Sequence, residues 1–131
     1  MNSTDIISQA DPDNLLAESL EIAISGAMYL STVIKDDGFF RYRVSPITDK
    51  TLKGYNALRH CGTTWTLLDV YQKTLCSDKV LQAAERSLSR MYDEYFRSYQ
   101  GLKHVCVISE TKNMIKTGGA GLAILALCTY Y

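Results

Sequence analysis

The sequence predicts an all-α protein of four main helices, arranged as two antiparallel helical hairpins with short β-like excursions. Two observations lead to this prediction. In three separate stretches apolar residues recur at steps of three and four, which places them on one face of a helix. A fourth stretch, residues 120–131, is apolar on every side and is far shorter than the ~20 residues that a membrane span needs. It therefore indicates a helix buried in protein.

Composition limits the class of protein. The chain has 131 residues, enough for a single domain, with residues 1–11 expected to be a flexible N-terminus. Its 14 basic and 14 acidic residues cancel, so it lacks the broad positive field that attracts nucleic acid or anionic membranes. We expect neither as a partner. Its 4 cysteines contain no Cys-x-x-Cys pair, and residues 1–14 do not resemble a secretory signal. These features favour a cytoplasmic protein with free thiols and no metal.

The first helix is predicted over residues 12–35. Asp11 can cap its free N–H groups, and Pro12 suits the first turn, where its missing N–H costs nothing. One apolar stripe continues through the helix: Leu16, Leu20, Ala23, Ala27, Leu30 and Ile34. The following residues 38–44 are aromatic, β-branched and bounded by turn residues, which predicts a short hairpin or extended excursion.

Two further helices have recognisable beginnings. Asn56 is the expected N-cap of a helix over residues 54–71. An amphipathic third helix begins at Ser77 or Asp78 and ends at Gly101.

The last part of the chain predicts one more excursion and one more helix. Residues 104–108 form a short β-like run. A glycine-rich segment, residues 117–121, then opens a helix over residues 122–131. Because this helix has no polar face, we expect protein to enclose it on all sides.

Four polar residues occupy one face of the second helix. Asn56, Arg59, His60 and Thr63 stand at positions i, i+3, i+4 and i+7, so their side chains project together from the first two turns. The partial positive charge of a helix N-terminus also favours an anionic ligand there.

Two interpretations of this polar face stay open. In the structural one, Asn56 caps the helix, His60 is a satisfied, partly buried residue, and Arg59 pairs with Asp36, Asp37 or Glu110. In the functional one, Arg59 and His60 contact a sugar or a carboxylate-bearing ligand. His60 would then transfer a proton, since its unperturbed pKa lies near neutrality.

Three motifs carry a resemblance to a known family. They are the run over residues 38–43 (Gly-Phe-Phe-Arg-Tyr-Arg), the helix start over residues 55–63 (Tyr-Asn-x-Leu-Arg-His-x-Gly-Thr), and Lys116-x-Gly118-Gly119. In these motifs the chain resembles the six-hairpin, or (α/α)6, toroid proteins of carbohydrate metabolism. The resemblance covers residues 16–131 and implies that the first and third helices are outer helices and the second and fourth inner ones.

The resemblance implies a carbohydrate-active or carbohydrate-binding protein whose ligand enters at one end of the inner helices. In that case Arg59 would hold a carboxylate or a hydroxyl pair, and His60 and Glu110 would be the candidate catalytic groups. Tyr55, Asn56 and Thr63 would complete the ligand-binding lining. The expected partner is a saccharide or carboxylate-bearing small molecule, with no cofactor.

A closed toroid needs six hairpins, and this chain supplies about two. We therefore expect it to be part of a longer protein, to associate with further hairpins or with copies of itself, or to form a compact four-helix domain. A glycosidase also needs two suitably spaced carboxylates, which the sequence does not reveal, so catalysis by this chain alone is not expected. The alternative function is a non-catalytic interaction module that assembles through the apolar faces of the second and fourth helices.

Two weaker motif matches would indicate other kinds of site, a zinc site and a phosphate loop. The triplet His60-Cys61-Gly62 resembles, in reverse, the Cys-His-Gly zinc motif of lanthionine cyclases, but no second cysteine ligand supports zinc. Residues 118–121 are glycine-rich, like a phosphate loop, yet no strand precedes them and no Lys-Ser/Thr pair follows. Close helix packing is the better interpretation.

Overall fold

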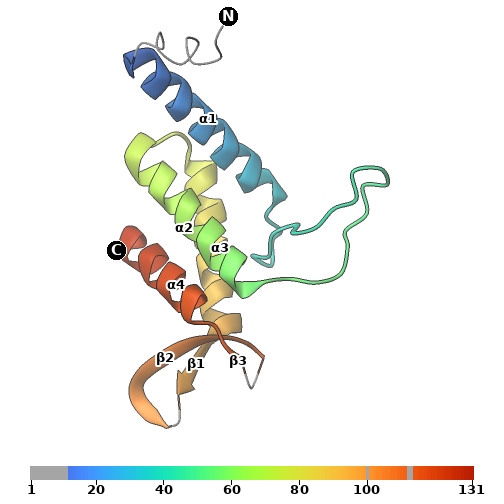
Figure 1. Cartoon of the computed structure of the whole chain (residues 1–131), viewed down its shortest axis with the longest axis vertical. Coiled ribbons are helices and arrows are strands. Elements are labelled where there is room, and N and C mark those ends of the chain that lie inside the picture. The colour runs from blue at the N-terminus through green and yellow to red at the C-terminus, as the bar shows by residue number, and fades with distance from the viewer. Residues whose placement is uncertain (1–11, 100, 112–113) are drawn as a thin grey trace, which may run out of the picture.

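The computed structural model describes the backbone of residues 12–99, 101–111 and 114–131, and the side chains of residues 13–98, 101, 108–109 and 114–131. Its helices are α1 (Pro12–Val33), α2 (Ala57–Thr74), α3 (Asp78–Tyr95) and α4 (Thr117–Tyr130). A small antiparallel sheet joins α3 to α4, with strands β1 (Phe96–Tyr99), β2 (Leu102–Thr111) and β3 (Met114–Ile115) in the order β1-β2-β3. The predicted all-α class with short β excursions is confirmed (Figure 1).

Helix α2 lies at the centre of the fold and contacts each of the other three helices. Its main neighbours are α3, which follows it, and α4, which lies alongside it (Figure 1). Glycines allow the close approach of α2 and α4. A Cβ atom added at Gly62 would lie 3.3 Å from Leu122 Cδ1, and one at Gly118 would lie 2.9 Å from Leu58 Cδ1. The fourth helix thus packs on the second rather than mainly on the third.

The predicted helix starts are correct where local chemistry determines them. The Asn56 side chain accepts a hydrogen bond from the backbone N–H of Arg59 at 3.1 Å, which makes Asn56 the N-cap of α2. Ser77 caps α3 in the same way, through the N–H of Lys79. The predicted cap Asp11 lies outside the described residues.

The third helix ends earlier than predicted, at Tyr95 instead of Gly101. Residues 96–99 form β1, which pairs with β2 from Phe96 opposite Ile108 onward. This non-local pairing takes the place of another helical turn. The predicted excursion at 104–108 lies within β2. By contrast, residues 38–44 form only the isolated bridges Ile34 to Phe40 and Val44 to Thr51. They belong to a loop that projects from the helices (Figure 1).

The core lies around α2, where α1, α3, α4 and β2 pack against it, and its largest buried side chains include Leu67, Val80, Met91 and Ile108. The expected enclosure of the fourth helix is wrong. Only Gly119, Ala123 and Ala126 of α4 are buried, because α2 covers one side of the helix and no other described element covers the opposite side. None of the described helices has the length and apolar character required to cross a membrane.

Candidate functional site

The predicted site residues gather around a pocket beside the N-terminal half of α2. The pocket is open to solvent and has a volume of about 430 Å³. Four predicted residues line it: Tyr55, Arg59, His60 and Thr63. Its other lining residues come from α1, the following loop, α2 and α4: Leu30, Phe40, Tyr42, Leu58, Gly62, Trp65, Thr66 and Leu122.

The described lining does not include the two remaining predicted residues. Asn56 stands at the N-cap of α2, where its side-chain oxygen is bonded to the helix backbone. Glu110 belongs to β2, and its side chain lies outside the described residues.

His60 is buried, with 2% of its surface exposed, and both ring nitrogens are hydrogen-bonded. Nε2 lies 2.9 Å from the carbonyl oxygen of Ser87, which can only accept, so Nε2 carries the proton. Nδ1 is then an acceptor and receives the hydroxyl proton of Tyr55 at 2.7 Å. The Tyr55 oxygen in turn accepts the backbone N–H of Phe40 at 3.0 Å. His60 therefore links the loop, α2 and α3.

The surroundings keep His60 neutral. Burial lowers its pKa, and the charge of Arg90 lowers it further, while the hydrogen bond to the Ser87 carbonyl acts in the opposite direction. Burial also raises the pKa of Tyr55 to about 12, so this hydroxyl remains a donor. With both nitrogens occupied, His60 has no free position for proton transfer to a ligand. The geometry favours the structural interpretation of His60.

Two hydroxyls that the sequence reasoning did not single out complete this network. The oxygens of Thr64 and Ser87 lie 2.6 Å apart, and Thr64 also donates to the carbonyl of His60 at 2.8 Å. Both residues are buried. Thr64 follows His60 by one helical turn, so its position could have been inferred, but nothing in the local pattern indicates Ser87, 27 residues further along the chain.

Arg59 does not pair with Asp36 or Asp37, the two expected carboxylates whose side chains the structure describes. Its Nη1 donates to the hydroxyl of Tyr42 at 2.6 Å, and its guanidinium carbon lies 5.5 Å from the centre of the Tyr42 ring. Asp37 instead accepts the backbone N–H of Phe39. Among the described residues no ion pair involves Arg59, and no carboxylate lines the pocket.

The pocket also has aromatic walls. The rings of Tyr42 and Tyr55 are 5.3 Å apart, and Trp65 lies one turn beyond Cys61 on α2. Tyr42 belongs to the aromatic run at 38–43, whereas Trp65 lies on α2 itself, two positions after Thr63. Both residues flank the polar face of α2 in the sequence, and this proximity is the signal that could have indicated Tyr42 and Trp65 as pocket residues.

No metal centre is evident in the part of the chain that the structure describes, since no three His, Cys, Asp or Glu side chains there lie close enough together. Cys61 is fully buried, and burial raises the pKa of its thiol to about 11. A thiol that stays protonated is a poor nucleophile and a poor metal ligand.

Comparison with known proteins adds no family: no protein-family model, curated protein or solved structure matches the chain. The resemblance to the toroid proteins accordingly stays a prediction, and the site is interpreted from its own geometry.

Asn56 offers a test of capping against ligand contact. We expect Asn56→Ala to lower the free energy of unfolding by about 1 kcal/mol, because one N–H of the first turn loses its acceptor. Asn56→Asp should restore the cap and the stability. Urea denaturation followed by circular dichroism measures both, and equal stability of Asn56→Ala and the parent chain would contradict the capping role.

Proposed function

We propose that this chain is a non-catalytic binding domain for a small, ring-shaped ligand that carries a carboxylate, a class that includes uronic-acid saccharides. The observation that supports the proposal is the pocket itself. Residues selected for their polar spacing on α2 line the same pocket as two aromatic side chains, Tyr42 and Trp65.

The size and lining suit such a ligand. Pockets of ~300–1,000 Å³ lined by apolar and aromatic side chains with a few polar groups are typical of small-molecule sites. Aromatic rings offer flat faces to a ring-shaped ligand. Arg59 supplies the one charged side chain in the described lining, and a guanidinium can bind a carboxylate through two parallel hydrogen bonds.

The same lining argues against hydrolysis of the ligand. Glycoside hydrolysis generally uses two carboxyl groups on either side of the scissile bond. The described lining contains none, and both nitrogens of His60 are already engaged. The proposal is therefore binding without turnover. The free thiols of Cys61, Cys76 and Cys128 support a reducing, cytoplasmic setting for this binding domain.

Calorimetric titration with uronic-acid oligosaccharides and their neutral counterparts tests this function. We expect the uronates to bind, and Arg59→Ala to weaken that binding by about tenfold or more, which is at least ~1.4 kcal/mol. Arg59→Lys should recover part of the loss, because the charge returns without the planar fork.

The matched control is Arg43→Ala. Arg43 is an exposed loop arginine that bonds the carbonyl of Lys53 and does not line the pocket, so its removal should leave binding unchanged. Failure of every uronate to bind the parent chain would overturn the proposal. Equal effects of the Arg43 and Arg59 substitutions would also overturn it.

A further inference from the structure

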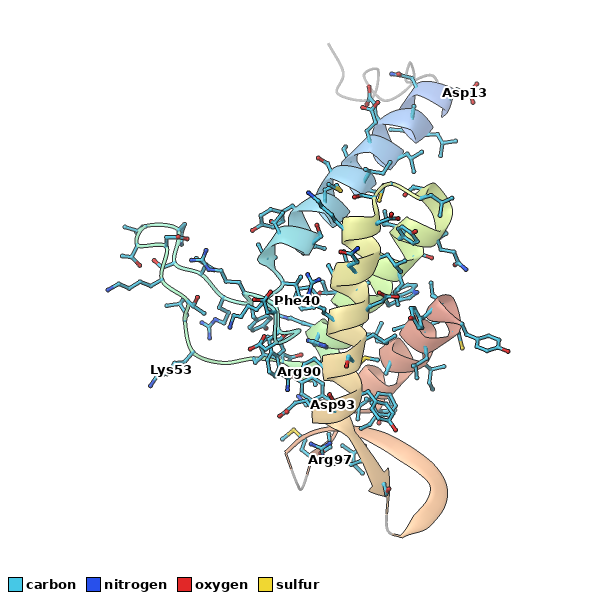
Figure 2. The ribbon with its side chains drawn as sticks, turned by 180° about the vertical axis from the view of Figure 1, so that it is seen from behind. Asp13, Phe40, Lys53, Arg90, Asp93 and Arg97 are labelled. Atoms are coloured by element: carbon cyan, nitrogen blue, oxygen red, sulfur yellow. The ribbon has the colours of Figure 1, made fainter. Side chains whose placement is uncertain are left out.

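A second pocket lies at the C-terminal end of α2, away from the pocket around Arg59. Three helices line it: the last two turns of α2, the first half of α3 and the last turn of α4. In Figure 2 the ribbons of α3 and α4 diverge towards the C-terminal end of α4. The pocket is open to solvent, has a volume of about 1040 Å³ and shares no described lining residue with the pocket around Arg59. It is therefore a separate candidate site, large enough for a small-molecule ligand.

Most of the lining of this second pocket is apolar. Its leucines are Leu68, Leu75, Leu81 and Leu127. Leu75 is 72% exposed although it has φ +50°, in the left-handed region where glycine is the usual residue at a helix end. Glycine would end the helix more readily, so the leucine favours a role for its side chain in the pocket. An apolar ligand chain would remove these side chains from water, which stabilises the complex.

Glu85 is the one charged side chain in the described lining. One of its carboxylate oxygens accepts the hydroxyl proton of Tyr130 at 3.0 Å, which links α3 to the end of α4. No lysine or arginine among the described residues pairs with Glu85. A cationic group that entered the pocket would therefore supply the opposite charge that this carboxylate lacks.

Two tyrosine rings accompany this carboxylate. The hydroxyl of Tyr71 donates to Asp78 at 3.3 Å, so acidic residues hold both phenols. Its hydrogen bond with Glu85 and the charge of that residue raise the pKa of Tyr130. Burial and the charges of Asp78 and Glu85 raise the pKa of Tyr71. The negative potential of Glu85 thus reaches both rings, and aromatic faces themselves attract cations such as quaternary ammonium groups.

We propose that the second pocket binds an amphiphilic organic cation, a single apolar chain that ends in an ammonium group. The ammonium group lies beside Glu85, near the rings of Tyr71 and Tyr130, and the chain lies over the leucines of the three helices. Glu85 repels the same chain when it ends in a carboxylate, so the pocket distinguishes ligands by charge. The proposal goes beyond uronate binding and does not depend on it, because the two pockets have separate linings.

Calorimetric titration of the full chain tests the proposal with three probes: decyltrimethylammonium, decanoate and tetramethylammonium, each below the concentration at which micelles form. Decanoate has a similar chain with the opposite charge, and tetramethylammonium has the charge without the chain. We expect decyltrimethylammonium to bind about tenfold or more tightly than either of the others. Backbone amide NMR shifts on binding should concentrate on residues 68–75, 81–85 and 127–131.

Substitutions test the two groups that contact the ammonium. Glu85→Gln removes the charge but keeps an acceptor for Tyr130, and it should weaken binding of decyltrimethylammonium by about fivefold or more. Glu94→Gln is the matched control, because Glu94 is exposed on the same helix and does not line the pocket, and it should leave binding unchanged. Tyr130→Phe keeps the ring and should retain most of the binding, whereas Tyr130→Ala should weaken it by about two- to fivefold. Circular dichroism should show the same fold for all four variants, since each substituted side chain is at least partly exposed.

Four results would overturn the proposal. The first two are a parent chain that does not bind decyltrimethylammonium and a parent chain that binds decanoate equally well. The third is an equal effect of Glu85→Gln and Glu94→Gln. The fourth is a set of amide shifts concentrated around Tyr42 and Arg59, which would place the cation in the other pocket. A parent dimer that Glu85→Gln converts to a monomer in sedimentation would instead assign the second pocket to another copy of the chain, and would contradict the proposal as well.

Discussion

Replacing Gly38 with alanine is expected to lower the free energy of unfolding by about 3–5 kcal/mol, a large share of the stability of a domain this size. Two causes add. Gly38 has φ +82°, in the left-handed region that a side chain disfavours, and its backbone lies directly against α3. An added Cβ atom would overlap the carbonyl oxygen of Arg86 and would lie 2.7 Å from Arg90 Cβ.

Gly101→Ala is the matched control for this substitution. Gly101 also has a positive φ, +72°, but an added Cβ there meets nothing within 4 Å. Gly101→Ala should therefore show only the cost of the positive φ, a loss of about 1 kcal/mol in the free energy of unfolding. Urea denaturation of both variants separates the two causes, and equal losses at Gly38 and Gly101 would contradict the close packing of the loop on α3.

The contact of this loop with α3 could not have been predicted from the sequence. Arg90 donates to the carbonyl of Asp37 at 2.6 Å, and its guanidinium lies 4.8 Å from the centre of the Phe39 ring. These partners are 53 positions apart, and each alone resembles an ordinary solvated residue. The sequence reasoning accordingly placed Asp36 and Asp37 only among the expected partners of Arg59.

The parts of the fold that could be predicted are those controlled within a few residues. The side chains of Asn56 and Ser77 bond N–H groups two or three positions away, so the sequence alone shows where α2 and α3 begin. The end of α3 depends instead on pairing with β2, and the exposure of α4 depends on which helices lie beside it. Apolar periodicity predicts which face can be buried, but not whether a partner is present.

The candidate site shows the same division. Arg59, His60 and Thr63 occupy the first two turns of one helix, so helical geometry alone brings them to one region. Their different environments arise from other elements. His60 is buried because the loop and α3 both cover it, whereas Arg59 lies at the pocket surface beside Tyr42, 17 residues earlier in the chain.

The buried imidazole of His60 should make the protein less stable in mild acid. In the unfolded chain its pKa is ~6.5, and burial lowers the pKa of the folded state. Below pH ~6.5 the unfolded chain therefore binds a proton that the folded chain excludes. Stability then falls by up to ~1.4 kcal/mol per pH unit, until the pH reaches the lower, folded pKa. Between pH 7 and pH 5 we therefore expect a measurable loss of stability.

The variant His60→Gln isolates this effect, because glutamine keeps a donor and an acceptor but does not titrate. Its stability should be lower at pH 7 and should vary less between pH 7 and pH 5, while His104, present in both chains, cancels in the difference. Parallel pH curves for the two chains would contradict the assignment. Below the folded pKa of His60, where the folded imidazole itself takes up a proton, acid should also weaken ligand binding, because protonated Nδ1 can no longer accept the hydroxyl proton of Tyr55. That hydrogen bond holds Tyr55 and Phe40 in the pocket wall, so the network that removes His60 from catalysis would also keep the pocket in shape.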